Sequence, residues 1–272
     1  MSQPFFDLKA THNPHRWYLP LTDALCVGPV GNNFMFGGVG LASAIVAMER
    51  TCGRPVVWAT AQYLSYARPP SVVDLDVWVP AHGRNTSQAR VISHVGDKEI
   101  LTVNAALGSR ESPVSRSWVT RPDVPGPLEC PTAEHWRGDH GGLHAQIDMR
   151  LAKGNYGFDM KGAAPSDDGR LIMWMRPKLG QDIDAATLAI LADHVPSGVG
   201  NALGIDAGGN SLDNTLRIVQ LVPTEWVLCD ISIHAVHAGF GHGSMRLFAE
   251  DGQLMATASQ SMIVRPHGPS EG

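Results

Sequence analysis

Apolar and polar positions in the first half of the chain predict one helix followed by a group of strands. Residues 36–50 are mostly small or apolar on every side, as expected for a helix that protein encloses on most faces. Gly53 suits the C-terminal end of that helix. Segments of alternating, β-rich character follow at 56–67, 72–82, 86–95 and 99–107. Turn residues between the later segments favour an antiparallel meander.

The second half of the chain repeats this order. A strand is predicted at 171–176 and a helix around 185–202. Further strands are predicted at 215–221, 226–237, 244–249 and 253–264. Asp251 and Gly252 join the last two and give a strong hairpin signal. One buried helix followed by a long antiparallel sheet that must wrap it is the hotdog architecture.

Identical residues at a fixed spacing support a duplication. Three pairs lie 156 positions apart: Gly83 and Gly239, Arg90 and Arg246, Gly96 and Gly252. The hydrophobic alternation matches at the same spacing from about residue 36 to 106, which favours an internal repeat over chance. We therefore predict an α+β protein of two tandem hotdog domains, at residues 1–110 and 170–272. A Pro- and Gly-rich crossover linker is predicted at 111–169.

Composition narrows the class of protein. Of 272 residues, 43% are hydrophobic and 17% are charged, which is typical of a globular chain. The net charge is −5 and Lys and Arg are scattered, so a nucleic-acid partner is not predicted. Asp7 and Lys9 interrupt the N-terminal region, and no window approaches the ~20 apolar residues of a membrane span. We expect a cytoplasmic protein whose four separated cysteines are reduced.

Short motifs in a specific order carry a family resemblance. The first half contains Phe-Gly-Gly at 36–38, Tyr-Ala-Arg-Pro-Pro at 66–70 and Gly-Arg-Asn-Thr-Ser at 83–87. The second half contains Leu-Ala-Asp at 191–193, Ser-Leu-Asp-Asn-Thr at 211–215 and Ala-Ser-Gln at 258–260. Together they resemble the acyl-CoA thioesterase II proteins, which are double hotdogs. The resemblance covers most of the chain and implies hydrolysis of acyl-CoA, without a cofactor.

The same resemblance implies a set of catalytic residues. In that family an Asp, a Ser or Thr and a Gln hold the nucleophilic water, and these correspond here to Asp193, Ser211 and Gln260. Asn210 or Thr215 could replace Ser211 if the register differs. The residues beside Asp193 are mostly apolar, and burial raises the pKa of a carboxyl group toward the range of a general base. The alternative is that Asp193 only caps the helix.

Substrate-binding residues are predicted in the first half. The helix N-terminus at Gly37 and Gly38 offers backbone N–H groups for the oxyanion. Arg68 and Arg90 are candidates for the CoA phosphates, although either could form a structural ion pair. At the spacing of 156, the first-half counterparts of the catalytic residues are Gly37, Pro55 and Asn104. Since only the second half keeps the acid, we expect one active site per chain, shared between the two domains.

Other classes of protein fit the sequence less well or stay open. Histidines 135, 140 and 144, and 234, 237 and 242, match no standard zinc spacing, so no metal site is predicted. The sequence contains no Gly-x-Ser-x-Gly motif, so a serine hydrolase is not predicted. A hotdog hydratase or dehydratase is disfavoured, because its Asp and His pair is not visible. A non-catalytic protein that binds acyl thioesters stays open, and a homo-oligomer is expected because hotdog sheets usually pair.

Overall fold

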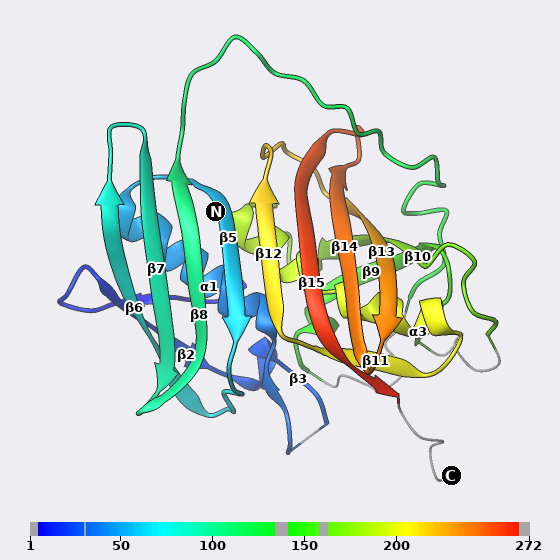
Figure 1. Ribbon diagram of the computed structural model, residues 1–272, viewed down its shortest axis with the longest axis horizontal. Coiled ribbons are helices and arrows are strands. Elements are labelled where there is room, and N and C mark those ends of the chain that lie inside the picture. Colours follow the sequence, from blue (N-terminus) through cyan, green and yellow to red (C-terminus); the bar gives the residue numbers. More distant parts are fainter. Residues whose placement is uncertain (1–4, 30, 134–140, 158–162, 267–272) are drawn as a thin grey trace.

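A computed structural model describes residues 5–29, 31–133, 141–157 and 163–266. Within those residues a single 13-stranded sheet runs through both halves of the chain (Figure 1). The strand order is β1-β2-β6-β7-β8-β5-β12-β15-β14-β13-β10-β9, and β11 pairs with β15 beside this path. A separate pair, β3 (Cys26–Val27) and β4 (Phe34–Met35), leads into the first helix.

The first half has one long helix, α1 (Gly37–Cys52). Its strands are β1 (Lys9–Ala10), β2 (Arg16–Leu21), β5 (Val56–Tyr63), β6 (Ser71–His82), β7 (Thr86–Val95) and β8 (Lys98–Gly108). Small residues allow α1 to lie close to the sheet, and most of its side chains are buried. Gly53 ends the helix in the left-handed conformation, as the sequence predicts.

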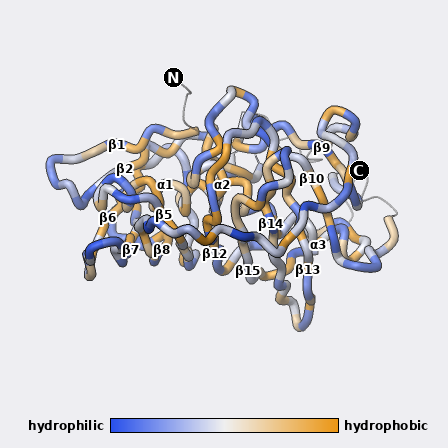
Figure 2. Tube along the Cα trace, turned by 90° about the horizontal axis from the view of Figure 1, so that it is seen from above, coloured by the Kyte–Doolittle hydropathy of each residue, from blue (hydrophilic) through white to orange (hydrophobic). Residues whose placement is uncertain are grey.

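The second half repeats the arrangement with a shorter helix, α2 (Ala185–Ala192). Its strands are β9 (Ile147–Lys153), β10 (Arg170–Pro177), β11 (Ala207–Ser211), β12 (Asp213–Ile218), β13 (Val227–His237), β14 (Phe240–Ala249) and β15 (Leu254–Pro266). Helices α1 and α2 pack against each other. Figure 2 shows their hydrophobic residues in the interior, where they form one core with the inner face of the sheet.

The two halves join where β5 pairs with β12 in antiparallel orientation. At the centre of this pair, Thr60 and Thr215 face each other and their hydroxyl oxygens lie 2.7 Å apart. The result is a continuous sheet wrapped around two helices, which confirms the predicted double hotdog.

The predicted helix at 185–202 is wrong as one continuous element. Helix α2 ends at Ala192, a 3₁₀ turn covers Val195–Ser197, and a second helix, α3, covers Gly198–Leu203. Pro196 explains the break, since it lacks an N–H and its ring excludes a continuing α-helix. The break leaves Asp193 at the C-terminal end of α2 rather than inside a helix.

The gapless spacing of 156 is also wrong at the strand that carries Gln260. Thr60 and Thr215 are 155 positions apart; Asn104 pairs with Thr60, whereas Ser259 pairs with Thr215. A shift of one residue turns a side chain to the other face of a strand. Asn104 is accordingly exposed and Gln260 buried. The true counterpart of Gln260 is the buried, apolar Ala105.

Gly37, the predicted counterpart of Asp193, also does not occupy the equivalent position. Gly37 is the first residue of α1, whereas Asp193 follows the last residue of α2. The two residues therefore occupy opposite ends of their helices. They still meet in space, because α1 and α2 pack with Gly38 against Asp193.

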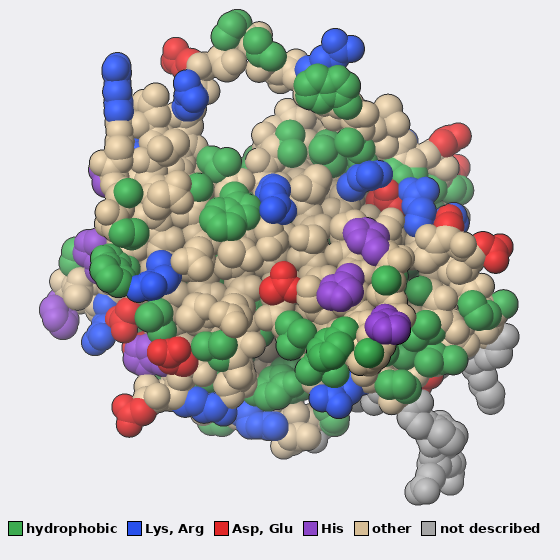
Figure 3. Space-filling view, viewed as in Figure 1, with side chains coloured by type: hydrophobic (Ala, Val, Ile, Leu, Met, Phe, Trp, Pro, Cys, Tyr) green, Lys and Arg blue, Asp and Glu red, His purple; other side chains and the backbone are tan. Residues whose placement is uncertain are grey.

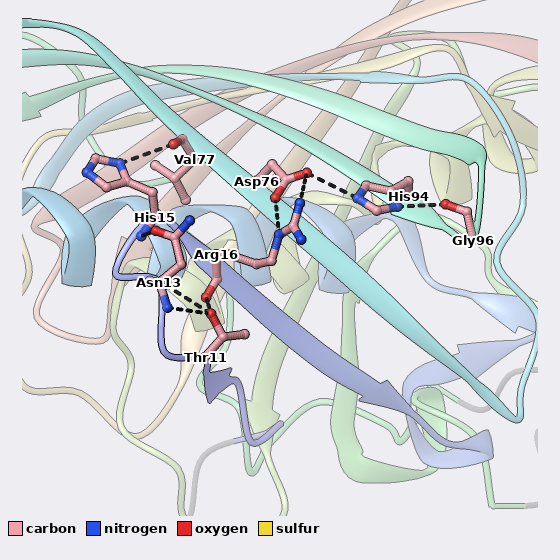
Figure 4. Close-up of polar contacts among 8 residues, drawn as sticks. All are labelled: Thr11, Asn13, His15, Arg16, Asp76, Val77, His94 and Gly96. Carbon is pink, nitrogen blue, oxygen red and sulfur yellow. Dashed lines mark hydrogen bonds and ion pairs between the residues drawn. The ribbon is translucent and has the colours of Figure 1, made fainter.

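An ion-pair network links β2 to the neighbouring strands β6 and β7 in the first half of the sheet (Figure 4). Arg16 Nε donates to Asp76 on β6 at 2.7 Å, and His94 on β7 contacts the other carboxylate oxygen at 3.2 Å. The hydrogen bond from Arg16 holds the pKa of Asp76 below its usual value. Three neighbouring strands are thus linked at a partly exposed position.

Part of the segment predicted as a surface crossover belongs to the sheet. Strand β9, within residues 111–169, pairs with β10 at the edge of the second half. Residues 119–130 add a second, smaller core on the outer face of β10, β13 and β14. There Trp174 is buried and its Nε1 donates to the carbonyl oxygen of Pro125 at 2.9 Å.

Replacing Trp174 with Ala is expected to lower the free energy of unfolding by about 3 to 5 kcal/mol. The change removes a buried ring and the N–H donor to the Pro125 carbonyl, which keeps only the weak donor Cys130 Sγ at 3.6 Å. Urea denaturation measures the loss. Trp118→Ala is the control, because Trp118 lies on the crossover that contains Pro125 but is 82% exposed. The effect of Trp118→Ala on the free energy of unfolding should stay within about 0.5 kcal/mol. A Trp174 variant as stable as the native protein would show that the crossover does not brace this face.

Candidate active site

A cavity of 430 Å³ opens where the end of β5, the start of α1 and the end of α2 meet. Its apolar lining includes Val27, Met35, Phe36, Ile100, Leu101 and Leu212. Asp193, Ser211, Gly37 and Tyr63 also line it. An apolar space with a few polar groups at one place is the usual form of a small-molecule site.

Asp193 is the centre of the polar group. It is 6% exposed, and both carboxylate oxygens accept hydrogen bonds. The backbone N–H of Gly38 donates to Oδ2 at 2.6 Å, and Asn214 Nδ2 donates to Oδ1 at 3.3 Å. Gln260 Nε2 also donates to Oδ1, and the same nitrogen lies 3.3 Å from Ser211 Oγ. The structure therefore brings together Asp193, Ser211 and Gln260.

Strand alternation explains how these side chains reach the Asp193 carboxylate. On β15, Gln260 shares the inner face with the buried Ala258 and Met262. On β12, Asn214 shares the inner face with the buried Leu216. Asp193 reaches the same point because α2 ends there. Three separate elements thus converge on one carboxylate.

Burial gives Asp193 the pKa of a general base. Removal from water disfavours the charged carboxylate and raises its pKa from 3.8 to about 7. Hydrogen bonds from Gly38, Gln260 and Asn214 act in the opposite direction, because they stabilise the charged form. Near neutral pH the group can therefore both accept and release a proton.

The two alternatives to Ser211 make other contacts. Asn210 Nδ2 donates to the hydroxyl of Tyr66 at 2.8 Å. Thr215 lies on the outer face of β12, where its hydroxyl meets Thr60. Of these three residues, Ser211 is the one that hydrogen-bonds to Gln260 in the described part of the chain. The geometry therefore favours Ser211 for the hydroxyl position.

Two residues beside Asp193 were not identified from the sequence. Asn214 is fully buried and donates to the carboxylate. Tyr63 comes from β5 of the other half, and its hydroxyl is buried near Asp193. Alternation along β12 could have placed Asn214 on the inner face with Leu216. No sequence signal marks Tyr63, because only the pairing of β5 with β12 brings it there.

Of the predicted substrate-binding residues, Gly37 lines the cavity, whereas Arg68 and Arg90 are not part of its lining. Gly37 lines the cavity, but the N–H of Gly38 is already engaged by Asp193. Arg68 is exposed next to the cavity residue Ala67 and donates to Asn32 at 2.5 Å. Arg90 lies outside the cavity lining, and its guanidinium stacks on Trp78, 4.7 Å from the ring centroid.

Arg90 is not part of the cavity lining, which follows from its position in β7. Its neighbours Ala89 and Val91 are buried on the inner face, so Arg90 points to the outer face. The structure instead places Arg265 in the lining of the cavity. Figure 3 shows Lys and Arg scattered over the outer face of the sheet rather than gathered into one patch.

Aromatic rings close one side of the cavity. His194, directly after Asp193, is buried with its ring 5.3 Å from that of Phe36 and 5.4 Å from that of His144. His135 and His140 lie outside the described residues. Among the described residues, no group of three or more His, Cys, Asp or Glu is arranged to hold a metal ion.

The fold and the family match together define a double-hotdog thioester hydrolase. A family model for the acyl-CoA thioesterase C-terminal domain matches residues 122–264. The chain belongs to the acyl-CoA thioesterase family. No curated protein matches the chain. None of the described helices is long and apolar enough to span a membrane.

Solved structures agree with this family. A protein from Novosphingobium aromaticivorans assigned as a thioesterase is 34% identical, with a TM-score of 0.83 over 94% of this chain and 97% of that chain. A hot dog protein of unknown function from Alicyclobacillus acidocaldarius is 18% identical, with a TM-score of 0.82 over 96% of each chain. An acyl-CoA thioesterase II from Mycobacterium marinum is 17% identical, with a TM-score of 0.72 over 97% of this chain and 98% of that chain. The last two show a shared fold.

Proposed function

We propose that this protein hydrolyses acyl-CoA to a carboxylic acid and CoA by direct attack of water, with Asp193 as the general base. The observation that carries the proposal is the buried Asp193 carboxylate, with a pKa of about 7, at the wall of an apolar cavity. A buried carboxyl group with a shifted pKa at a cavity is a strong candidate for acid–base chemistry. The family membership supplies the thioester as substrate.

The proposed reaction needs no covalent enzyme intermediate. Ser211 and Gln260 orient a water molecule, and Asp193 takes one of its protons as the oxygen attacks the thioester carbonyl carbon. The carbonyl oxygen becomes an oxyanion in the tetrahedral intermediate. The carbon–sulfur bond then breaks, and the CoA sulfur receives the proton from Asp193 as it leaves. Asp193 thus returns to its starting state, and the acyl group keeps the oxygen of water.

The proposed binding mode follows the polarity of the cavity. The acyl chain packs against the apolar lining that includes Phe36, Ile100 and Leu101. The phosphates of CoA lie toward the exposed rim, where Arg265 lines the cavity and Arg68 is close by. Guanidinium groups can bind phosphate through two parallel hydrogen bonds.

Thiol release from a panel of acyl-CoAs tests the function. The panel runs from acetyl-CoA to palmitoyl-CoA and includes phenylacetyl and branched acyl groups. Release of CoA from at least one member supports the proposal and identifies the preferred acyl group. Binding without release would make the protein a non-catalytic acyl-thioester binder. Hydration of an enoyl-CoA without CoA release would point to a hydratase.

The pH dependence of hydrolysis should report Asp193. Because the base must be ionised, kcat/KM should fall about tenfold per pH unit below the pKa and level off above it. The midpoint is expected at about pH 7, the pKa of the buried carboxyl group. Rates measured from about pH 5 to about pH 9 on one substrate give the profile. A flat profile across that range would contradict a base with this pKa.

A further inference from the structure

The helix N-terminus has one donor fewer for the substrate than its sequence suggests. The N–H of Gly38 donates to Asp193 Oδ2 at 2.6 Å, so this donor orients the base. Oxyanion holes work through several donors aimed at the developing charge, and loss of one is costly. Gly37, the other glycine of the helix start, lines the cavity. A second donor for the thioester oxygen has to come from elsewhere.

The hydroxyl of Tyr63 lies at this position, beside the side chain of Asn214. Its Oη is buried, and it makes no hydrogen bond of normal geometry to any described residue. A buried hydroxyl without a partner costs free energy, so such groups are few in native proteins. Tyr63 lies on the inner face of β5, after the buried Ala59 and Ala61, and lines the cavity.

The oxygens of Asp193 and Tyr63 both border the position that a side chain of Gly37 would occupy. A Cβ built on Gly37 would lie 2.8 Å from Asp193 Oδ2 and 3.1 Å from Tyr63 Oη. Both oxygens are therefore within about 3 Å of one point, and they can be at most 5.9 Å apart, the sum of those two distances. A space between a carboxylate and a phenol, kept open by glycine, can take the thioester carbonyl with the attacking water.

We infer that Tyr63 is a catalytic residue whose hydroxyl donates a hydrogen bond to the thioester carbonyl oxygen and to the oxyanion formed from it. This role rests on the proposed hydrolysis at the same cavity. The Tyr63 proton stays on its oxygen throughout, while the proton of water moves to Asp193 and then to the leaving sulfur. The substrate site is thus formed by both halves of the chain, with the base from the second half and this donor from the first.

The surroundings of Tyr63 keep it a donor. Burial raises the pKa of its hydroxyl well above the ordinary value, and the nearby charge of Asp193 acts in the same direction. A hydrogen-bonding contact with the Asn214 side chain lowers the pKa in part. At neutral pH the phenol is therefore protonated and can donate. Asp213 is the other carboxylate near Tyr63 and also favours the protonated form.

Tyr63→Phe tests the inference, because it removes only the hydroxyl. Loss of one oxyanion donor is expected to lower kcat by about 10² to 10³, with much less change in KM. The melting temperature should stay equal or rise, because a buried hydroxyl without a partner is removed. Tyr18→Phe is the control, since Tyr18 lies on β2, outside the cavity lining. Native kcat in Tyr63→Phe would overturn the inference.

A second measurement separates this inference from the proposed function. The probe is an acyl-CoA ketone analogue in which a methylene replaces the sulfur and the carbonyl carbon is ¹³C. Its infrared carbonyl stretch, measured when bound, should move to higher frequency in Tyr63→Phe and stay unchanged in Tyr18→Phe. That shift in a protein without hydrolysis would end the proposed function but keep the hydrogen bond. An unchanged stretch in Tyr63→Phe would overturn the inference even if hydrolysis is confirmed.

Discussion

Asp193→Asn is expected to lower the turnover of acyl-CoA by about 10² to 10⁴, because the variant loses the group that accepts the proton of water. The change is close to isosteric. The oxygens of Asn214 and Gln260 have no hydrogen-bond partner in the described structure, so both amides can turn to accept from the new amide group. The substrate affinity should therefore change little. Thiol release under saturating substrate gives the loss in kcat.

The same substitution should stabilise the protein at alkaline pH. The pKa of Asp193 rises from 3.8 to about 7 on folding, so ionisation costs stability progressively through that interval and fully above it. By that shift the native protein loses roughly 4 kcal/mol that Asp193→Asn does not lose. Urea unfolding of both proteins at about pH 4 and about pH 8 measures the difference. A variant that is inactive and less stable at about pH 8 would point to a structural role for Asp193 instead.

A matched substitution at a surface position controls for the Asp-to-Asn change itself. Asp251→Asn removes an acid from the hairpin between β14 and β15, outside the cavity lining. It should leave kcat at the native value. If both variants lose activity equally, then the effect of Asp193→Asn is not specific to the base.

The sequence predicted most of the sheet because strand alternation is a local signal. Segments 86–95 and 99–107 agree closely with β7 and β8, and Asp251 with Gly252 marks the last hairpin. Strand β9 was missed because the composition of residues 111–169 resembles a loop, and the strand is recognisable only by its pairing with β10. Local patterns therefore identify strands better than they identify the edges of a sheet.

The register of the repeat could not be predicted from residue spacing alone. The turn between β7 and β8 has two residues between the paired Val95 and Lys98, whereas the turn between β14 and β15 has three between Ala249 and Gln253, so the count changes by one without a change of fold. The error moved Asn104 into the place of Ala105. It did not affect the motif at Gln260, whose inner position follows from its own apolar neighbours.

The site was predicted in part for a similar reason. Asp193, Ser211 and Gln260 stand in recognisable motifs, and in the structure Gln260 lies within hydrogen-bonding distance of both Asp193 and Ser211. Tyr63 and Asn214 have no motif, because their place depends on the contact of β5 with β12 across the two halves. Arg90 was chosen by residue type alone, and strand alternation turns it away from the cavity. Residues that act across a domain junction thus need the structure.

Gly37→Ala is expected to lower kcat by about 10² or more, because the new methyl group enters the reaction space. Its carbon would lie 2.8 Å from Asp193 Oδ2 and 2.9 Å from Tyr63 Cζ, closer than normal contacts. Asp193 is held by hydrogen bonds, so either the base or the phenol ring must move. A displacement of about 1 Å from the productive geometry can cost about 10² in rate.

The helix itself should tolerate this change, which makes the activity loss diagnostic. Alanine is a better helix former than glycine, and the backbone of Gly37 has no positive φ, so backbone strain is not introduced. Gly126→Ala is the control, because a Cβ there meets only Glu129 at an ordinary 3.5 Å. Steady-state kinetics and thermal unfolding of both variants separate the two effects. Native kcat in Gly37→Ala would show that the space between Asp193 and Tyr63 is not where the thioester reacts.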